Sequence, residues 1–138
     1  MPSHGIVALI RNDLEQYLLL EDAREPMLGY WAPPHGRCEP TDTSEEQSIV
    51  REVLEETGLT VTPLEKVFTQ PADTKVKTVS FWLVHAASAS TIGLNDESSA
   101  YGWFDIESLL KLRLYPGTRT FFERVLNGEV RLGQDEHS

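Results

Sequence analysis

The sequence contains a single cysteine, Cys38, among its 138 residues, so no internal disulfide bond can form. This excludes the disulfide-stapled domains that are common among small secreted proteins. No constellation of His, Asn or Asp residues marks Cys38 as a nucleophile, so a small packing residue is favoured over a catalytic thiol. The sequence also lacks a run of about eighteen apolar residues, so no membrane span is expected.

Basic residues are scarce, because 12 lysines and arginines stand against 22 acidic residues and give a net charge of −10. This charge opposes binding to duplex nucleic acid, and no basic stripe is visible. An acidic protein can still bind a polyphosphate if a divalent cation bridges the two negative partners. The first residues lack the basic segment and long apolar region of a secretory signal, which leaves the cytoplasm as the expected location.

The sequence has no repeats, and its length suits one domain over residues 1–138, with a loose tail at 133–138. The predicted strands comprise 5–10 and 17–20 as a hairpin-like pair, 59–68 as an irregular or edge strand, 76–86 as a central strand and 101–104 as a short strand. Two short helices are predicted at 106–112 and 118–126, with Asp105 as an N-cap and Pro116 and Gly117 between them. Strands and helices that mix without βαβ alternation indicate an α+β domain.

The stretch from residue 31 to residue 59 is the part of the chain whose spacing indicates a particular chemistry. Apolar residues three and four positions apart predict a helix over 43–57. Its predicted buried face consists of Ile49, Val50, Val53 and Leu54. Its start signals are Asp42, Thr43 and Ser44, with Glu45 and Glu46 placed for a capping box, and Gly58 is its end signal.

Carboxylates crowd one side of this predicted helix, because Glu52, Glu55 and Glu56 fall on an arc beside the apolar face. Like charges at these spacings destabilise a helix by a few tenths of a kcal/mol per pair, so a compensating partner is expected. Clustered oxygen ligands suit Mg²⁺ or Mn²⁺, and Arg51 can fix a carboxylate through a bidentate pair. The alternative is an ordinary solvated acidic face.

Gly36 and the run REVLEETGL at 51–59 resemble the Nudix box, Gly-x5-Glu-x7-Arg-Glu-U-x-Glu-Glu-x-Gly-U, in which U is aliphatic. The second half matches at every specified position. The first half departs from it, because Asp42 stands where the family has glutamate and eight residues instead of seven separate it from Arg51. The resemblance implies a Nudix-type α/β/α sandwich with a mixed sheet between helices. It also implies Glu52, Glu55 and Glu56 as metal carboxylates, with the carbonyl of Gly36 as a further ligand.

Three further segments resemble the asymmetrical diadenosine tetraphosphate hydrolases within this family. They are WAPPHG at 31–36, followed by Glu39 and Pro40, then KTVSFWL at 77–83 and ESSAYGW at 97–103. The family patterns are Trp-x-Pro-Pro-Lys-Gly, Lys-Thr-Val-x-Tyr-Trp-Leu and Glu-x-x-Ala-Tyr-x-Trp. Here His35 replaces the lysine and Phe81 replaces a tyrosine. The first change removes a fixed positive charge, because imidazole is mostly uncharged at neutral pH.

The resemblance implies substrate contacts outside the acidic helix. Lys77 is the candidate for a phosphate contact, Tyr101 for stacking on adenine and His35 for facing the polyphosphate. Trp31 could face a nucleobase or simply pack over the start of the helix. A solvated strand-end lysine and a half-buried core tyrosine are the alternatives for Lys77 and Tyr101.

Hydrolysis needs a base that takes the proton of the attacking water, and both Glu55 and Glu97 are candidates. Glu97 could equally be an exposed loop residue. The predicted function is metal-dependent hydrolysis of a phosphoanhydride bond in a nucleoside diphosphate linked to another group, with diadenosine tetraphosphate favoured. Nucleoside triphosphates, nucleotide sugars and 5′-triphosphate RNA are alternative substrates, and a non-catalytic nucleotide-binding module is an alternative of another class. The expected partner is a small nucleotide, and the expected assembly is a monomer or homodimer.

Overall fold

The computed structural model describes residues 3–72, 76–87 and 91–132, so the predicted tail at 133–138 lies outside the described residues. The elements in chain order are β1 His4–Ile10, β2 Tyr17–Asp22, β3 Trp31–Ala32, β4 His35–Arg37, α1 Glu45–Thr57, β5 Val61–Pro71, β6 Thr78–Ala86, β7 Ser98–Phe104, α2 Ile106–Leu109 and α3 Pro116–Leu126. No helix within the described ranges is long and apolar enough to cross a membrane.

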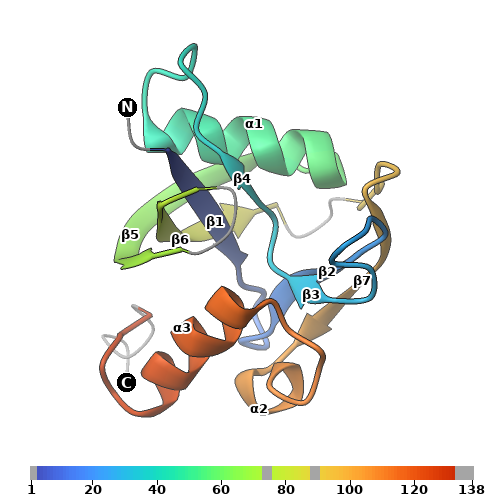
Figure 1. The fold of residues 1–138 in the computed structure, drawn as a ribbon, viewed down its shortest axis with the longest axis vertical. Helices are drawn as coiled ribbons and strands as arrows, with labels where there is room; N and C mark the ends of the chain where they lie inside the picture. The colour runs from blue at the N-terminus through green and yellow to red at the C-terminus, as the bar shows by residue number, and fades with distance from the viewer. Residues whose placement is uncertain (1–2, 73–75, 88–90, 133–138) are drawn as a thin grey trace.

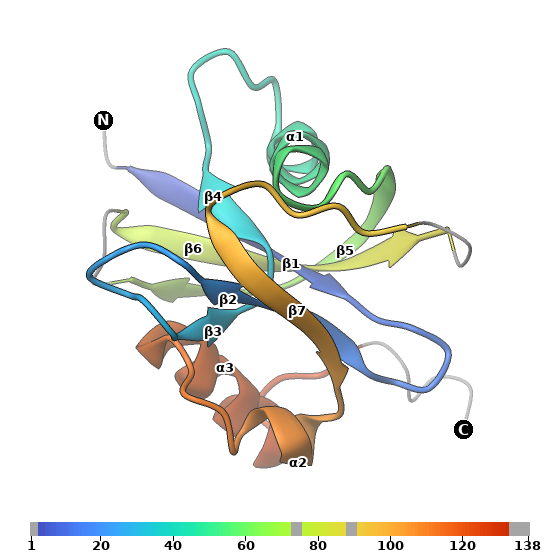
Figure 2. The ribbon, with the colours of Figure 1, turned by 90° about the vertical axis from the view of Figure 1, so that its right-hand side faces the viewer.

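Two sheets lie between the helices, with α1 on one side and α2 and α3 on the other (Figures 1 and 2). The larger sheet has the order β4-β1-β6-β5 and is mixed, because β1 runs parallel to β6 and antiparallel to β4. The smaller sheet, β3-β2-β7, is antiparallel. The predicted mixed sheet between helices is therefore confirmed.

Strand β1 is buried on both faces, which explains why its sequence is apolar at nearly every position. Ile6 and Ala8 pack in the core beneath α1, whereas Val7 and Leu9 pack in the core beneath α3. Such a strand needs a partner on each edge, and β4 and β6 supply them. The strand is therefore the centre of the fold.

The predicted hairpin-like pairing of β1 with β2 is wrong. The two strands belong to different sheets and share only an isolated bridge between Arg11 and Tyr17. The reason is that both edges of β1 are occupied, so β2 diverges after the turn and pairs instead with β3 and β7.

The other strand predictions are largely confirmed. β6 is an interior strand, and β5 is an edge strand whose register shifts on either side of 65–66, just after Pro63. β7 begins at Ser98, before the predicted start at residue 101. Pro116 and Gly117 form the first turn of α3 instead of a linker, because proline is well tolerated at the start of a helix.

Candidate active site

Helix α1 begins and ends where local capping chemistry predicts. The side chain of Ser44 accepts a hydrogen bond from the backbone N–H of Gln47, and Gly58 adopts a left-handed conformation with φ of 75°. The predicted capping box with Glu45 or Glu46 is replaced by Gln47, whose side chain accepts a hydrogen bond from the backbone N–H of Thr43. These caps fix both the register of the helix and the direction of its carboxylates.

Glu56 lies almost completely inside the protein, with 8% of its surface exposed. Its Oε1 accepts a hydrogen bond from the backbone N–H of His35 at 3.3 Å. Burial raises the pKa of Glu56 well above its ordinary value, and the hydrogen bond and negative charge of the neighbouring Glu52 raise it further. The nearby Glu97 makes a smaller contribution in the same direction. A proton or a cation is therefore favoured at this position.

Gly36 on β4 is required by the close approach of Glu52. A Cβ atom at position 36 would lie 2.1 Å from Cδ and 2.4 Å from Oε1 of Glu52. Strand β4 pairs with β1 opposite Ile6, so the backbone at this position is held in place. A side chain at position 36 would therefore have to displace the Glu52 carboxylate.

Arg51 connects this carboxylate to the loop before α1. Its Nε and Nη2 donate to the two oxygens of Asp42 at 3.1 and 2.8 Å, while Nη1 donates to Glu52 at 2.9 Å. Nη2 also donates to the carbonyl of Arg37 at 3.0 Å. Hydrogen bonds from Arg51 and from the loop backbone hold the pKa of Asp42 far below its usual range. Arg51 is thus a positioning group for Glu52.

Glu55 lies at the exposed edge of this group of carboxylates. Its side chain is 57% exposed and lies 3.6 Å from Nη1 of Arg51. Across the described part of the chain, no three His, Cys, Asp or Glu side chains converge on a preformed ion site. The structure therefore brings Gly36, Glu52 and Glu56 together but leaves Glu55 at the rim. Hard oxygen donors beside a carboxylate with a raised pKa fit a divalent cation, which would take the place of the proton.

Glu97 approaches Glu56 from the segment that precedes β7. Its backbone N–H donates to Oδ1 of Asn95, and Nδ2 of Asn95 donates to the carbonyl of Glu55 at the end of α1, each at 3.0 Å. Glu97 lines the same small recess as Glu56, and its Oε1 lies 3.5 Å from Nη1 of Arg24. The side chain is 44% exposed, so water can reach it.

Three residues of this site were not predicted from the sequence, namely Asp22, Arg24 and Tyr115. The hydroxyl of Tyr115 donates to Oδ2 of Asp22, and Nε of Arg24 donates to Oδ1 at 3.3 Å. Burial opposes ionisation of Asp22, but these hydrogen bonds outweigh it and lower its pKa. Burial and the adjacent Asp22 carboxylate raise the pKa of Tyr115. These hydrogen bonds fix the three side chains relative to one another, and Arg24 in turn forms an ion pair with Glu97.

The ring of His35 stands between several adjoining recesses. Nδ1 donates to the carbonyl of Pro33 at 2.8 Å, since a carbonyl oxygen can only accept, and the ring contacts Tyr115 at a centroid distance of 5.1 Å. His35 and Tyr115 together line three recesses: that of Glu56 and Glu97, one of about 90 Å³ between the larger sheet and the start of α3, and one of about 390 Å³ beside Arg24.

Gln70 lines the recess between the larger sheet and the start of α3 and is almost fully buried. Its Nε2 donates to the carbonyl of Gly117 at 3.1 Å, whereas its Oε1 has no hydrogen-bond partner among the residues that the structure describes. Phe81, which replaces the family tyrosine, is also buried there and stacks on Phe121 at 4.0 Å. This recess is largely apolar and carries one unsatisfied acceptor.

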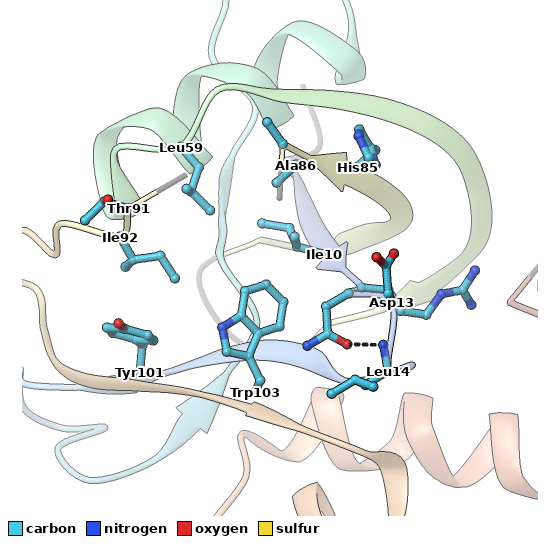
Figure 3. A pocket seen from close by; sticks show the side chains of 13 residues that line it. Ile10, Asp13, Leu14, Leu59, His85, Ala86, Thr91, Ile92, Tyr101 and Trp103 are labelled. Carbon is cyan, nitrogen blue, oxygen red and sulfur yellow. Dashed lines mark hydrogen bonds between the residues drawn. The ribbon is translucent and has the colours of Figure 1, made fainter. Parts of the chain in front are cut away.

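Three predicted substrate contacts lie away from the carboxylates. Trp31 packs on Phe104 at a centroid distance of 5.5 Å and against the core beneath α3, so it packs as the alternative expected, but not over the start of helix α1. Lys77 is exposed just before β6, and its carbonyl accepts a hydrogen bond from Ala72 at 2.8 Å. Tyr101 lines a separate cavity of about 470 Å³, which contains none of the site carboxylates (Figure 3).

The comparisons with known proteins agree on a family. The NUDIX domain model matches residues 1–125. The chain is 29% identical over 107 residues to the asymmetrical bis(5′-nucleosyl)-tetraphosphatase of Caenorhabditis elegans, which covers 72% of this chain and 75% of that protein. A MutT protein from Methanosarcina mazei Go1 has 30% identity and a TM-score of 0.74, covering 91% of this chain and 94% of that one.

A crystal structure of a C. elegans Ap4A hydrolase binary complex has the same fold, with 24% identity and a TM-score of 0.74 over 91% of this chain and 96% of that one. The family model spans nearly the whole chain. It includes helix α1, strand β4 with Gly36, and strands β6 and β7 on either side of Glu97. The chain therefore belongs to the Nudix family and is a Nudix pyrophosphohydrolase.

Proposed function

We propose that this protein hydrolyses a phosphoanhydride bond of a dinucleoside polyphosphate such as diadenosine tetraphosphate. The observation that carries the proposal is the pair of adjacent carboxylates on α1: Glu52 packs against Gly36, and the buried Glu56 lines a recess shared with Glu97. The similarity to a bis(5′-nucleosyl)-tetraphosphatase supports the substrate class. Nudix hydrolases generally use divalent cations, and Mg²⁺ or Mn²⁺ is the proposed cofactor.

Glu52 and Glu56 are the proposed holders of the cation, with the Gly36 carbonyl beside them and Glu55 at the rim. A bound divalent cation neutralises charge on phosphate oxygens and makes a water molecule more acidic. Arg51 keeps the Glu52 carboxylate in place through the hydrogen bond of 2.9 Å. The protein thus places the charged groups before the substrate binds. Positioning and charge stabilisation supply most of the rate enhancement in phosphoryl transfer.

Glu97 is the favoured general base because it is exposed to water and adjoins Glu56. In the proposed step the water oxygen attacks a phosphorus atom, and Glu97 takes its proton. The phosphoanhydride P–O bond breaks, and the leaving phosphate keeps the electron pair. Arg24 holds Glu97 from the opposite side, at 3.5 Å. Glu55 remains the alternative base.

The recesses around His35 are the proposed site for a nucleotide. Their walls combine the His35 and Tyr115 rings with the buried acceptor of Gln70. Aromatic and apolar walls with few polar atoms suit a base and ribose. Lys77 stays a predicted phosphate contact; its backbone is hydrogen-bonded to Ala72, which lines the recess between the larger sheet and the start of α3.

The test is a Mg²⁺-dependent screen of diadenosine tetraphosphate, nucleoside triphosphates, nucleotide sugars and 5′-triphosphate RNA, read by product identity. We expect diadenosine tetraphosphate to give two unequal nucleotides with the highest kcat/KM. Cleavage of another class alone would reject the substrate assignment, and binding without cleavage would indicate a binding module. Glu97→Gln and Glu55→Gln, compared for kcat, identify the base.

A further inference from the structure

Negative charge predominates in the three recesses around His35. Their walls include the carboxylates of Asp22, Glu25, Glu56 and Glu97. The chain as a whole has a net charge of −10, so its field also opposes the approach of an anion. A polyphosphate that enters these recesses is therefore repelled unless positive groups face it there.

Arg24 is the only lysine or arginine that lines these recesses in the part of the chain that the structure describes. It lines both the recess of Glu56 and Glu97 and the adjoining recess of about 390 Å³. Lys77, the phosphate contact expected from the sequence, is not among the lining residues. The side chain of Arg24 is 53% exposed, so a ligand in either recess can reach its guanidinium group.

The guanidinium group of Arg24 is oriented before a substrate binds. Its Nε donates to Oδ1 of Asp22 at 3.3 Å, and the same oxygen accepts from the backbone N–H of Arg24 at 2.9 Å. The other oxygen of Asp22 accepts a hydrogen bond from the hydroxyl of Tyr115. An arginine that is already held in place loses less side-chain entropy when it binds a phosphate group.

The same group keeps donors for a ligand. Arginine has five N–H donors, and here Nε is bonded to Asp22 while Nη1 lies 3.5 Å from Oε1 of Glu97. Nη2 has no hydrogen-bond partner among the described residues, so it can donate to an anion in the recesses. Because Nη1 and Nη2 belong to one planar group, an anion bound to Nη2 lies next to the Glu97 carboxylate.

We propose that Arg24 binds a phosphate oxygen of the substrate through Nη2 while its Nη1 holds Glu97. A planar guanidinium group suits this double task, because its donors point along fixed directions toward two acceptors at once. Arg24 then binds the substrate and also sets how far the general base lies from the phosphate group. This inference rests on the proposed function and adds to it a substrate contact from the segment between β2 and β3.

The first test measures two constants at a fixed concentration of free Mg²⁺: KM for diadenosine tetraphosphate, and Ki for inhibition by inorganic tripolyphosphate, which has phosphates but no nucleoside. We expect Arg24→Ala to raise both by about 10- to 150-fold, the usual effect of losing a hydrogen bond to a charged group. Arg24→Lys keeps the charge without the planar donor group, so its constants should lie between those of the parent and Arg24→Ala.

Lys111→Ala is the matched control, because it removes the same charge at an exposed position that lines none of the three recesses. Both constants should stay within about twofold of the parent in this variant, since exposed charges farther apart than about 10 Å are largely screened by salt. An equal rise of Ki in Lys111→Ala and Arg24→Ala would show an effect of net charge alone and would overturn the contact.

A second comparison separates phosphate binding from the hold on Glu97, because an arginine that acts only on Glu97 has no effect once that carboxylate is gone. Binding of tripolyphosphate with Mg²⁺ is measured by calorimetry in Glu97→Gln and in the double variant Glu97→Gln/Arg24→Ala. We expect the double variant to bind about 10- to 150-fold more weakly. Equal affinities would overturn the phosphate contact and leave the proposed hydrolysis intact. Failure of the parent to cleave diadenosine tetraphosphate would overturn the proposed function, whereas the calorimetric comparison would still decide whether Arg24 binds phosphate.

Discussion

The substitution Glu56→Gln tests two effects of the buried carboxylate separately, namely its effect on the free energy of unfolding and its role in metal-dependent turnover. Glutamine keeps an oxygen that can accept from the backbone N–H of His35, and its amide can donate to Glu52 as a protonated Glu56 would. The variant therefore resembles the protonated site in shape and hydrogen bonding. What it removes is the negative charge.

The sign of the stability effect follows from the raised pKa of Glu56. Without metal, the folded protein retains a proton that the unfolded chain releases above its ordinary pKa of about 4.3. The stabilisation of the folded protein by this retained proton is complete below the ordinary pKa, and it is lost as pH rises through the folded-state pKa of Glu56. Over that interval the free energy of unfolding falls by about 1.4 kcal/mol per pH unit. Glutamine has no such loss, so the variant should gain stability relative to the parent as pH rises.

The assay is thermal unfolding in EDTA between pH 4 and 8. For a domain of this size, 1 kcal/mol corresponds to about 4 °C in Tm, so the difference between variant and parent should widen measurably with pH. Glu55→Gln, the same change at an exposed position of α1, should follow the parent. A difference in Tm between Glu56→Gln and the parent that does not change with pH would refute the inference that burial raises the pKa of Glu56.

The same variant should lose turnover with Mg²⁺ by about two orders of magnitude or more, because charge placed by a metal is worth several kcal/mol in the transition state. Mg²⁺ should raise Tm of the parent at pH 8 and leave that of Glu56→Gln nearly unchanged. Parental kcat in the variant at saturating substrate would reject Glu56 as a metal carboxylate.

Three other substitutions test the surroundings of this pair. Gly36→Ala should lower kcat by about 100-fold, since the new Cβ displaces the adjacent carboxylate. Gly93→Ala, whose new Cβ meets no atom of the described residues within 4 Å, should leave kcat unchanged. Equal kcat values in the two variants would contradict the inference that a side chain at position 36 displaces the Glu52 carboxylate. Tyr115→Phe should lower the free energy of unfolding by about 1.5–3 kcal/mol through its lost hydrogen bond to Asp22, as measured by urea unfolding, and an unchanged midpoint would contradict this. His35→Lys should lower KM for diadenosine tetraphosphate above neutral pH, because its charge persists there; superimposable KM curves from pH 6 to 9 would remove His35 from the site.

Local chemistry made α1 predictable from the sequence. Its caps, Ser44 and Gly58, act within a few residues of the helix ends, and the apolar spacing correctly identifies Ile49 and Val53 as buried. The prediction was wrong for Leu54, which is 51% exposed. Strand pairing was harder to predict because partners are chosen over long distances. The apolar run of β1 could have indicated a strand buried on both faces, which is typical of the interior of a mixed sheet and not of a hairpin.

The contacts that position Glu97 could not be predicted from the spacing of residues in the sequence. Asp22 and Tyr115 lie 93 positions apart in the sequence and meet only because α3 returns to the end of β2. The one local signal is an aspartate that ends an apolar strand, followed two residues later by Arg24. Such a pair is common on protein surfaces, so it does not by itself indicate a site.

The departure of Asp42 from the family motif is explained by what Arg51 requires. The guanidinium group of Arg51 binds both oxygens of Asp42 through Nε and Nη2 and holds Glu52 through Nη1, so the bidentate pair with Asp42 fixes its orientation. Asp42 is itself fixed, because its Oδ2 accepts from the hydroxyl of Ser48 and the backbone N–H of Glu39. The longer loop therefore places a shorter acid where the guanidinium can reach it. The position of a carboxylate in space, not its spacing in the sequence, determines whether the Glu52 carboxylate is held.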